Sequence, residues 1–338
     1  MTCTVDDATR TSLARVVAPL GTLVAAERLT GGMFATTHRV TLADGTRVVV
    51  KTAPTATERL LTYEHDLVRS ESLVYARVAD RPDLLMPRLL HFDGSRTDLP
   101  GDVVVASHLA GTPWEDAGFG TVAQDPRAAR AQRDLGALMA RLHTVTGDRF
   151  GYVGAVAARG GPDAPPGLRL HGATWPEAFG RMVEAVLADA ARWDVDLRPA
   201  TVRAALARHT DALAQVTTPV LVHGDLWAGN LFVDPDGTLV GVIDPERALW
   251  GDPLMDLVGA DQFGRGDVAP GLRAGWEQVT PLVLDRAARV RLLLYRTYMS
   301  AILHVELVPR GYAGDFGAWY RRTSGELLDR ALEELAAP

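Results

Sequence analysis

Residues 219–256 concentrate oxygen-bearing side chains of the kind that bind metal ions and move protons. The segment from His223 to Asn230 reads HGDLWAGN, and Asp244 follows the next apolar run. Asn230 and Asp244 are candidate Mg²⁺ ligands, because this ion prefers a few oxygen ligands and keeps several waters. Asp225 is a candidate general base for the proton of an attacking hydroxyl. The set suits phosphoryl transfer, which depends on positioning and on neutralising phosphate charge.

The same chain uses lysine and asparagine once each. Lys51 is the one lysine among 35 basic residues, and Asn230 is the one asparagine. This skew is typical of a GC-rich coding background, in which arginine and aspartate replace them wherever they can. Lys51 and Asn230 are therefore predicted to have roles that arginine and aspartate cannot fill. Lys51 ends the apolar run Val48-Val49-Val50, so we expect it on a strand. A strand-borne lysine followed much later by H-x-D-x-x-x-x-N resembles the phosphate-handling set of protein kinases, which implies that Lys51 contacts nucleotide phosphates.

Bulk properties indicate an ordinary globular protein with room for two lobes. The chain has 338 residues, of which 47% are hydrophobic and 23% charged. No apolar run reaches the length of a membrane span, and the N-terminus does not resemble a secretory signal. Cys3 is the single cysteine, which excludes an internal disulfide and a Cys-based zinc site and favours the cytoplasm. The net charge of −7 argues against nonspecific nucleic-acid binding.

The first hundred residues are predicted to form strands around one helix. Residues 39–42 and 46–51 form a hairpin about the turn Ala43-Asp44-Gly45. Apolar spacing predicts a helix over about 58–79, and Val103 to Ala106 reads as a buried strand. An irregular connector follows over 107–113. We therefore predict a nucleotide-binding lobe at 1–106 and a catalytic and substrate-binding lobe at 107–338.

The second lobe is predicted to be mostly helical. Asp125-Pro126 is a helix start with an N-cap and a proline at the first helical position. Residues 147–176 are rich in Gly and Pro and are predicted to be a loop. Helices are expected at about 176–193, 199–216, 285–307 and 316–336. The motif block adds a strand at 220–222 and a hairpin of 231–233 with 239–243, which places Asp244 at its end.

The block HGDLWAGNLF…IDPERALWGDPLMDL resembles the aminoglycoside phosphotransferase family, which also includes choline, fructosamine and macrolide kinases. The resemblance extends from about Leu29 to the C-terminal helices. It implies an α+β, bilobal, protein-kinase-like fold, with a small β-rich N-lobe and a larger helical C-lobe. It also implies ATP as the phosphate donor, with GTP as the alternative, and Mg²⁺. In this family the histidine orders the loop, so His223 is assigned a structural role. Gly251-Asp252-Pro253 and Asp256 resemble the family's segment that braces the loop, so Asp256 is also assigned a structural role.

The resemblance extends to the nucleotide site. Gly31 and Gly32, in Thr30-Gly31-Gly32-Met33-Phe34, lie where a phosphate-covering loop is expected, although the kinase pattern has three glycines. Glu64 and Glu71 are seven residues apart on the predicted helix face, and either could pair with Lys51. The pattern R-x-E-x-x-x-Y at residues 69–75 favours Glu71. The resemblance also implies that backbone groups from Ser107 to Leu109 bind adenine.

Residues around the motif block are candidates for the acceptor pocket. Trp227 and Trp250 flank the acidic loops and either wall this pocket or fill the core behind it. Glu246 and Asp261 are further pocket candidates, and so are Trp114, Glu115, Asp116 and Trp276. His143 ends an apolar stripe and is interpreted as a packed histidine.

Other functional classes find less support. The P-loop motif G-x-x-x-x-G-K-[ST], the hydrolase motif G-x-S-x-G and the metalloprotease motif H-E-x-x-H are all absent. A pseudokinase would be expected to lose Lys51, Asp225, Asn230 or Asp244, and all four are present. The predicted partner is a small molecule with a free hydroxyl, with no nucleic acid or membrane, and the protein is expected to be a monomer or homodimer. An antibiotic is the first choice of acceptor, and a metabolite of the choline, fructosamine or amino-acid kinase type is the alternative.

Overall fold

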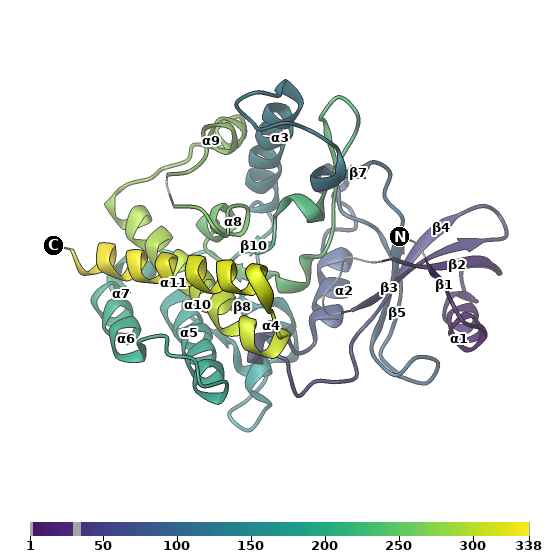
Figure 1. Cartoon of the computed structure of the whole chain (residues 1–338), viewed down its shortest axis with the longest axis horizontal. Coiled ribbons are helices and arrows are strands. Elements are labelled where there is room, and N and C mark those ends of the chain that lie inside the picture. Colours follow the sequence, from purple (N-terminus) through teal and green to yellow (C-terminus); the bar gives the residue numbers. More distant parts are fainter. Residues whose placement is uncertain (1–2, 30–34, 266, 338) are drawn as a thin grey trace.

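The computed structural model describes residues 3–29, 35–265 and 267–337. A β-rich N-terminal region lies at one end of the molecule, and a larger, mostly helical C-terminal region lies at the other (Figure 1). The strands are β1 Cys3–Thr4, β2 Leu23–Leu29, β3 Thr36–Leu42, β4 Arg47–Thr52, β5 Leu89–Asp93, β6 Val103–Ser107, β7 Thr112–Pro113, β8 Phe150–Tyr152, β9 His171–Gly172, β10 Val220–Val222, β11 Leu231–Val233, β12 Leu239–Val242 and β13 Leu249–Gly251. The α-helices are α1 Asp7–Val17, α2 Leu67–Arg77, α3 Pro126–Leu142, α4 Val153–Ala158, α5 Trp175–Arg192, α6 Pro199–Arg208, α7 Thr210–Ala214, α8 Leu254–Gly259, α9 Pro270–Trp276, α10 Arg286–Arg310 and α11 Gly314–Ala336.

The N-terminal sheet has six antiparallel strands in the order β1-β2-β3-β4-β6-β5. Valines of β4 and β6 alternate between its two faces, as expected for a sheet buried on both sides. Helix α1 packs its apolar side on one face, and α2 packs Val68 and Tyr75 on the other. Since Val74 of α2 and its C-cap residue Val78 belong to the large C-terminal core, this helix joins the two regions.

The structure confirms the predicted hairpin at 39–51 and the strand at 103–106, but the helix predicted over 58–79 is wrong in its first half. A short 3₁₀ turn occupies Thr62–Glu64, and Asp66 adopts left-handed backbone angles with φ of 63° before α2 begins. The backbone N–H of Leu61 donates to the Glu64 carboxylate at 2.8 Å. Glu64 therefore lies in the 3₁₀ turn and Glu71 lies in α2. The prediction that both share one face of a single helix is wrong.

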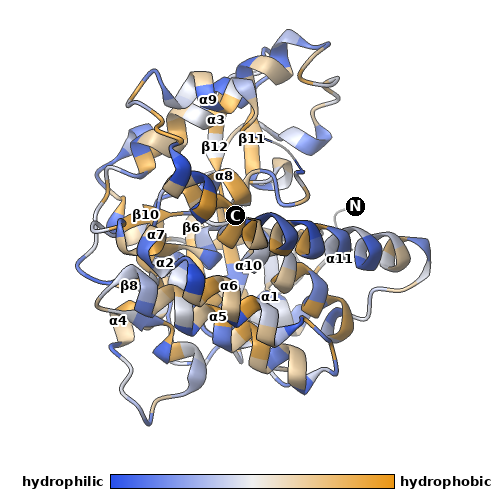
Figure 2. Ribbon diagram, turned by 90° about the vertical axis from the view of Figure 1, so that its left-hand side faces the viewer, coloured by the Kyte–Doolittle hydropathy of each residue, from blue (hydrophilic) through white to orange (hydrophobic). Residues whose placement is uncertain are grey.

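The C-terminal region is built around one hydrophobic core that α3, α5, α10 and α11 surround. These helices are amphipathic, with apolar and polar residues on different sides (Figure 2). Asp125 caps α3 as predicted, because its side chain accepts from Arg127 N–H. The helices predicted near 176–193, 285–307 and 316–336 are confirmed as α5, α10 and α11. Within the described part of the chain, no helix has the length and apolar character needed to cross a bilayer.

Two predictions for this region are wrong. The loop predicted at 147–176 contains β8, α4 and β9, because residues distant in sequence supply its pairing: β13 pairs with β8, which pairs with β9. Gly151 makes this pairing possible, since its φ is +123° and a Cβ would lie 2.2 Å from Leu170 O. The helix predicted at 199–216 is divided at His209 into α6 and α7.

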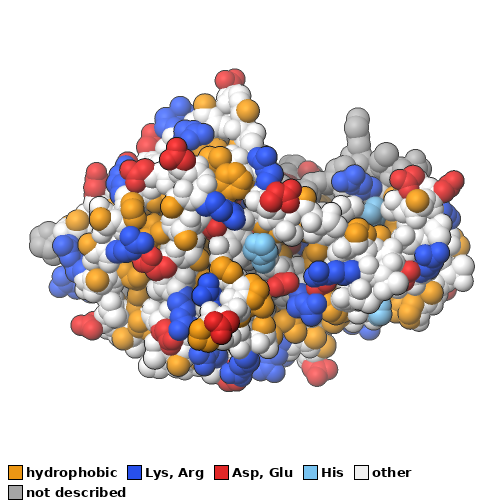
Figure 3. All heavy atoms as spheres, turned by 90° about the horizontal axis from the view of Figure 1, so that it is seen from below, with side chains coloured by type: hydrophobic (Ala, Val, Ile, Leu, Met, Phe, Trp, Pro, Cys, Tyr) orange, Lys and Arg blue, Asp and Glu red, His pale blue; other side chains and the backbone are white. Residues whose placement is uncertain are grey.

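Two small antiparallel sheets carry the motif block. One has the order β10-β13-β8-β9 and the other β12-β11-β7. The β11–β12 hairpin confirms the prediction for residues 231–243. Strand β7 pairs with β11, so the chain enters the second small sheet directly after leaving β6 of the N-terminal sheet. On the face shown in Figure 3, basic and acidic side chains are interspersed over both regions.

Candidate functional site

The loop after β10 is fixed from behind by a buried carboxylate. Asp256, at the start of α8, is fully buried and accepts hydrogen bonds from the backbone N–H groups of His223 at 3.2 Å and Gly224 at 2.8 Å. His143 Nε2 lies 2.8 Å from the same carboxylate, and His223 Nε2 lies 3.0 Å from Ile243 O. Gly224 has φ of +80°, a conformation that favours glycine. His223, His143 and Asp256 therefore shape the loop that presents Asp225.

Two side-chain amides hold the carboxylate of Asp225. Asn230 Nδ2 donates to Asp225 Oδ2 at 3.0 Å and to its backbone oxygen at 2.9 Å. Gln262 Nε2 donates to the other carboxylate oxygen, Oδ1, at 2.7 Å. Hydrogen bonds to a charged acceptor are stronger than neutral ones. The orientation of Asp225 is thus set from both sides, and the sequence analysis had not identified Gln262.

Asp244 follows β12 in a left-handed conformation, with φ of 61° and ψ of 50°. Such a conformation is uncommon for a residue other than glycine, and it is concentrated at functional sites. The backbone N–H of Ile243 donates to Asn230 O at 3.0 Å, which connects the end of the hairpin to the loop after β10. The fold therefore brings Asp225, Asn230 and Asp244 together, as the motif spacing predicted.

Lys51 extends from β4 into a cluster of three carboxylates. Its ammonium donates to Asp244 Oδ1 at 2.8 Å and to Glu246 Oε2 at 2.9 Å. Glu71 Oε2, from α2, also lies 2.8 Å away, as an ion pair outside hydrogen-bond geometry. Burial lowers the pKa of the lysine, but the carboxylates raise it by more, so that its pKa lies well above the ordinary value. Lys51 is therefore charged and joins the sheet, α2 and the motif block.

Glu71, and not Glu64, is the helix partner of Lys51. Burial raises the pKa of Glu71 to about 7, although Lys51 acts in the opposite direction. Glu64 instead pairs with Arg310 at the end of α10, with 2.8 Å between Oε1 and Nη2. Arg310 also pairs with Glu306 at 2.8 Å. Glu64 thus ties the segment before α2 to the C-terminal helices.

The donor set fits a divalent cation held by few protein ligands. Within the described part of the chain, no protein group donates a hydrogen bond to Asn230 Oδ1 or Asp244 Oδ2. The contacts given above involve the other side-chain atoms, Asn230 Nδ2 and Asp244 Oδ1. The described residues contain no group of three or more His, Cys, Asp or Glu side chains that could hold a metal ion. Asn230 and Asp244 would supply two oxygen ligands, a number that suits Mg²⁺ because this ion keeps several waters.

The predicted adenine segment lies where the N-terminal sheet leads into the C-terminal region. Ser107 ends β6, and its N–H and Oγ bond to the backbone of Arg88. Among the described residues, no hydrogen bond within the chain involves the backbone of Leu109. The backbone groups of Leu109 are therefore able to pair with a ligand, whereas the N–H of Ser107 is already bonded to Arg88. Gly31 and Gly32 lie outside the described residues.

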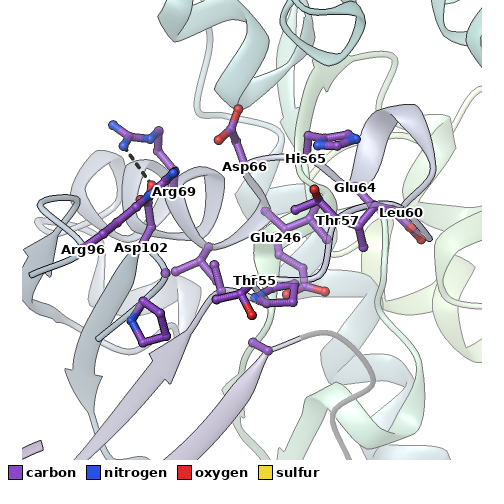
Figure 4. Close-up of a pocket in the computed structure, with 17 residues that line it drawn as sticks. Thr55, Thr57, Leu60, Glu64, His65, Asp66, Arg69, Arg96, Asp102 and Glu246 are labelled. Carbon is purple, nitrogen blue, oxygen red and sulfur yellow. Dashed lines mark hydrogen bonds and ion pairs between the residues drawn. The ribbon is translucent and has the colours of Figure 1, made fainter. Parts of the chain in front are cut away.

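Glu246 was predicted to line the acceptor pocket, but its carboxylate bonds to Lys51. It also lines a cavity of about 300 Å³ beside the start of α2 (Figure 4). On the far wall of this cavity Asp102 forms ion pairs of 2.8 Å with both Arg69 and Arg96. Glu246 is two residues after Asp244 and reaches the same lysine, so its assignment to the acceptor pocket is corrected.

The other acceptor candidates divide between surface and core. Of the two alternatives for Trp250, the structure supports the core: only 8% of it is exposed, and it packs against Gly147. Its assignment to the acceptor pocket is corrected accordingly. Trp227 is 42% exposed, two residues after Asp225. Asp261 faces Arg296 at 3.6 Å, whereas its neighbour Gln262 reaches Asp225. The signal missed in the sequence was therefore one residue away, on a segment without a motif.

Comparison with known proteins identifies the family. Residues 25–288 match the Phosphotransferase enzyme family, abbreviated APH. The chain belongs to this family. Among curated members, a probable ketoamine kinase of Enterococcus faecium is 26% identical over 189 residues, which cover 54% of this chain and 63% of that protein. A probable ketoamine kinase of Synechocystis is 30% identical over 115 residues, which cover 34% of each. The matches thus span less than two thirds of these two relatives.

Solved structures of the phosphotransferase family share the fold over nearly the whole chain. A candidate fructosamine-3-kinase from Thermobifida fusca has a TM-score of 0.65 and 23% identity, covering 95% of this chain and 98% of that one. The aminoglycoside phosphotransferase APH(4)-Ia has a TM-score of 0.60 and 18% identity, covering 97% and 99%. The fold is therefore the kinase-like one that the motif block predicted, with a β-sheet N-terminal region and a helical C-terminal region.

Proposed function

We propose that this phosphotransferase family member transfers the γ-phosphate of ATP to a hydroxyl group of a small molecule. The observation that carries the proposal is the carboxylate of Asp225, which two amides orient beside Asp244, a candidate metal ligand that pairs with the charged Lys51. Asp225 would accept the proton of the acceptor hydroxyl. The hydroxyl oxygen would then bond to the γ-phosphorus while the bond to the ADP oxygen breaks, and ADP would leave. GTP is the alternative donor.

The charges of the cluster support a requirement for a cation. Lys51 carries one positive charge against the carboxylates of Glu71, Asp244 and Glu246, which leaves a formal charge of −2 when all three are ionised. A nucleotide brings further negative charge. Asn230 and Asp244 would hold Mg²⁺, which would supply the positive charge that neutralises the phosphates. Lys51 would then contact the nucleotide phosphates.

Two classes of acceptor are proposed, each supported by named relatives. Curated relatives are named ketoamine kinases, which supports a ketoamine, the metabolic alternative of the sequence analysis. Solved structures include an aminoglycoside phosphotransferase and a macrolide 2′-phosphotransferase, the latter with a TM-score of 0.54 and 19% identity, which supports an antibiotic. In both cases the partner is a small molecule, and a cytoplasmic site of action fits the single cysteine.

The test is a screen of purified protein with Mg²⁺ and ATP against ketoamines, aminoglycosides, macrolides and other hydroxylated metabolites. Mass spectrometry should find one class that gains a single phosphoryl group, with one ADP released per product. The reaction should stop in the presence of EDTA, and Asp225→Ala should abolish it. Nucleotide binding without turnover of any acceptor would contradict the proposal and would favour a pseudokinase.

A further inference from the structure

Four arginines line one large cavity in a chain that is acidic as a whole. This cavity, which we call the arginine cavity, has a volume of about 820 Å³ and lies between the loop after α4, strand β9 and helix α5. Its charged lining residues are Arg149, Arg159, Arg169, Arg181 and Glu184. Four arginines and one glutamate carry a formal charge of +3, whereas the chain carries −7. The lining includes neither Lys51 and its carboxylate partners nor the loop of Asp225, so the arginine cavity is separate from the candidate active site.

Carboxylates of the protein neutralise only half of these arginines. The ion pairs formed by the charged lining residues are Arg159–Asp148, Arg181–Glu177 and Glu184–Arg203. Within the described part of the chain, Arg149 and Arg169 form no ion pair with a carboxylate. Their side chains bond instead to His171 and to the carbonyl of Pro162. Two guanidinium charges at the arginine cavity are therefore left for an anion from outside the protein.

A buried histidine fixes the orientation of Arg149. His171 is only 6% exposed, and its Nδ1 accepts a hydrogen bond of 2.8 Å from Arg149 Nε. Burial lowers the pKa of His171, so the ring is neutral, and its Nε2 donates to Gly160 O at 3.1 Å. Among the described residues, no protein group accepts a hydrogen bond from the two terminal nitrogens of Arg149. These nitrogens form the edge of the guanidinium that binds an oxyanion through two parallel hydrogen bonds.

The loop after α4 places Arg159 and Arg169 together. A Cβ at Gly160 would lie 2.4 Å from Leu168 O, so the two arms of the loop are in close contact there. Arg159 ends α4 in a left-handed conformation with φ of 52°. Arg169 Nη1 donates to Pro162 O at 3.1 Å, across the same loop. The loop extends from the lower edge of the molecule (Figure 2), so solutes can reach the arginine cavity.

We propose that the arginine cavity binds a phosphorylated small molecule at a site distinct from the site of phosphoryl transfer. A phosphate group carries close to two negative charges at neutral pH, which matches the two arginines without a carboxylate partner, whereas a single carboxylate carries one. Arg149 would hold two phosphate oxygens, and Arg169 would bind from the loop. The volume lies within the range of about 300–1,000 Å³ that is usual for small-molecule sites, so it leaves room for the body that carries the phosphate. Free phosphate shares the anionic chemistry and is the other source of such a ligand.

Calorimetric titration of the full chain, in EDTA and without nucleotide, tests this proposal. The probes are glucose 6-phosphate, inorganic phosphate and, as the uncharged control, glucose. We expect glucose 6-phosphate to bind at one site and glucose not to bind. Arg149→Gln should weaken binding about tenfold or more, as expected for the loss of a hydrogen-bonded charge. Arg169→Gln should do the same, and it keeps the test valid if Arg149→Gln misfolds, because Arg169 is exposed and bonds to one carbonyl. Arg322→Gln, at an exposed position outside the cavity, is the matched control.

The outcomes distinguish the arginine cavity from the candidate active site. Phosphate binding that Arg149→Gln or Arg169→Gln weakens and Lys51→Arg leaves unchanged would support the proposal. If inorganic phosphate then bound as tightly as glucose 6-phosphate, the cavity would hold phosphate itself, with the same two arginines. Loss of binding in Lys51→Arg, with wild-type affinity in both cavity variants, would overturn the proposal, because the probe would then occupy the nucleotide site. Absence of binding by both phosphate probes, or equal binding by glucose, would also overturn it.

Discussion

The two sides of the candidate site differ in how deeply their side chains are buried. On the lysine side, Lys51 is buried and all of its carboxylate partners lie within 3 Å. On the other side, the amides hold Asp225, but Trp227 on the same loop is exposed. A site that handles the same nucleotide in every turnover gains from rigid preorganised charges. On the side of Asp225, the proposed acceptor would itself cover Trp227, so the exposure of this ring fits the proposal.

Asp225→Ala should give the largest effect, because it removes the proposed base at the junction of the two sides. General base catalysis typically contributes about 10²–10⁴-fold, so kcat should fall by that factor. ATP affinity, measured by calorimetry, should change little, because the base does not hold the phosphates. Asp163→Ala is the control, since Asp163 is exposed. Near-normal turnover in Asp225→Ala would show that the base lies elsewhere.

Lys51→Arg should break the lysine side while keeping its charge. A planar guanidinium is too broad for a niche shared by Glu71, Asp244 and Glu246. Loss of one well-placed phosphate contact costs about 2–4 kcal/mol of transition-state stabilisation, or about thirty- to a thousandfold in kcat/KM for ATP. Steady-state kinetics beside Arg322→Lys, an exposed control, would measure it. Wild-type kcat/KM would mean that the single lysine supplies charge alone.

Gln262→Ala should have a smaller effect, confined to the acceptor side. It removes one hydrogen bond to the Asp225 carboxylate but leaves the bond from Asn230. Such a bond to a charged group contributes about 1.5 kcal/mol, so kcat should fall about tenfold. The KM for ATP should stay constant, and Gln278→Ala, at an exposed position, should behave as wild type. A rise in the KM for ATP by a similar factor would mean that Gln262 supports the whole site and not the base alone.

The smallest expected effect is on stability. One buried histidine from the N-terminal region and one from the C-terminal region allow the two to be compared. Burial lowers the pKa of His38 in the N-terminal sheet and of His304 in α10. The unfolded chain therefore binds protons more readily, and the stability from these neutral histidines is present above pH 6.5 and lost as the pH falls through the folded pKa. The free energy of unfolding, measured with urea, should fall less between pH 7.5 and pH 5.5 in His38→Gln and in His304→Gln than in wild type. Equal pH dependence in a variant would exclude its histidine as a source of the loss.

Sequence reasoning succeeded where local chemistry decides the outcome. The hairpin that delivers Asp244 and the N-cap at Asp125 follow from turn and cap residues within a few positions. It failed where distant residues decide. Strands β8 and β9 exist because β13 supplies the pairing, and α2 starts late because Asp66 turns the chain.

The site shows the same division. The motif block placed Asp225, Asn230 and Asp244 together, since a loop and a hairpin of known geometry join them. Gln262 is 37 positions from Asp225, in a segment without a motif, so only the folded chain reveals the contact. The two tryptophans were indistinguishable in sequence, because the exposure of each depends on what packs against it. Trp250 has Gly147 beside it, and Trp227 is left at the surface.

Because Lys51 is buried, proteolysis after this residue can report how often the N-terminal sheet opens. A protease specific for lysine has a single cleavage point in all 338 residues, after residue 51, in the middle of a six-stranded sheet. Cleavage must wait until β4 leaves its neighbours, so the digestion rate follows the population of the opened state when opening is fast. A nucleotide that binds only the closed form would slow digestion in proportion to its occupancy. One gel band splitting into residues 1–51 and 52–338 would then measure ligand affinity without any label.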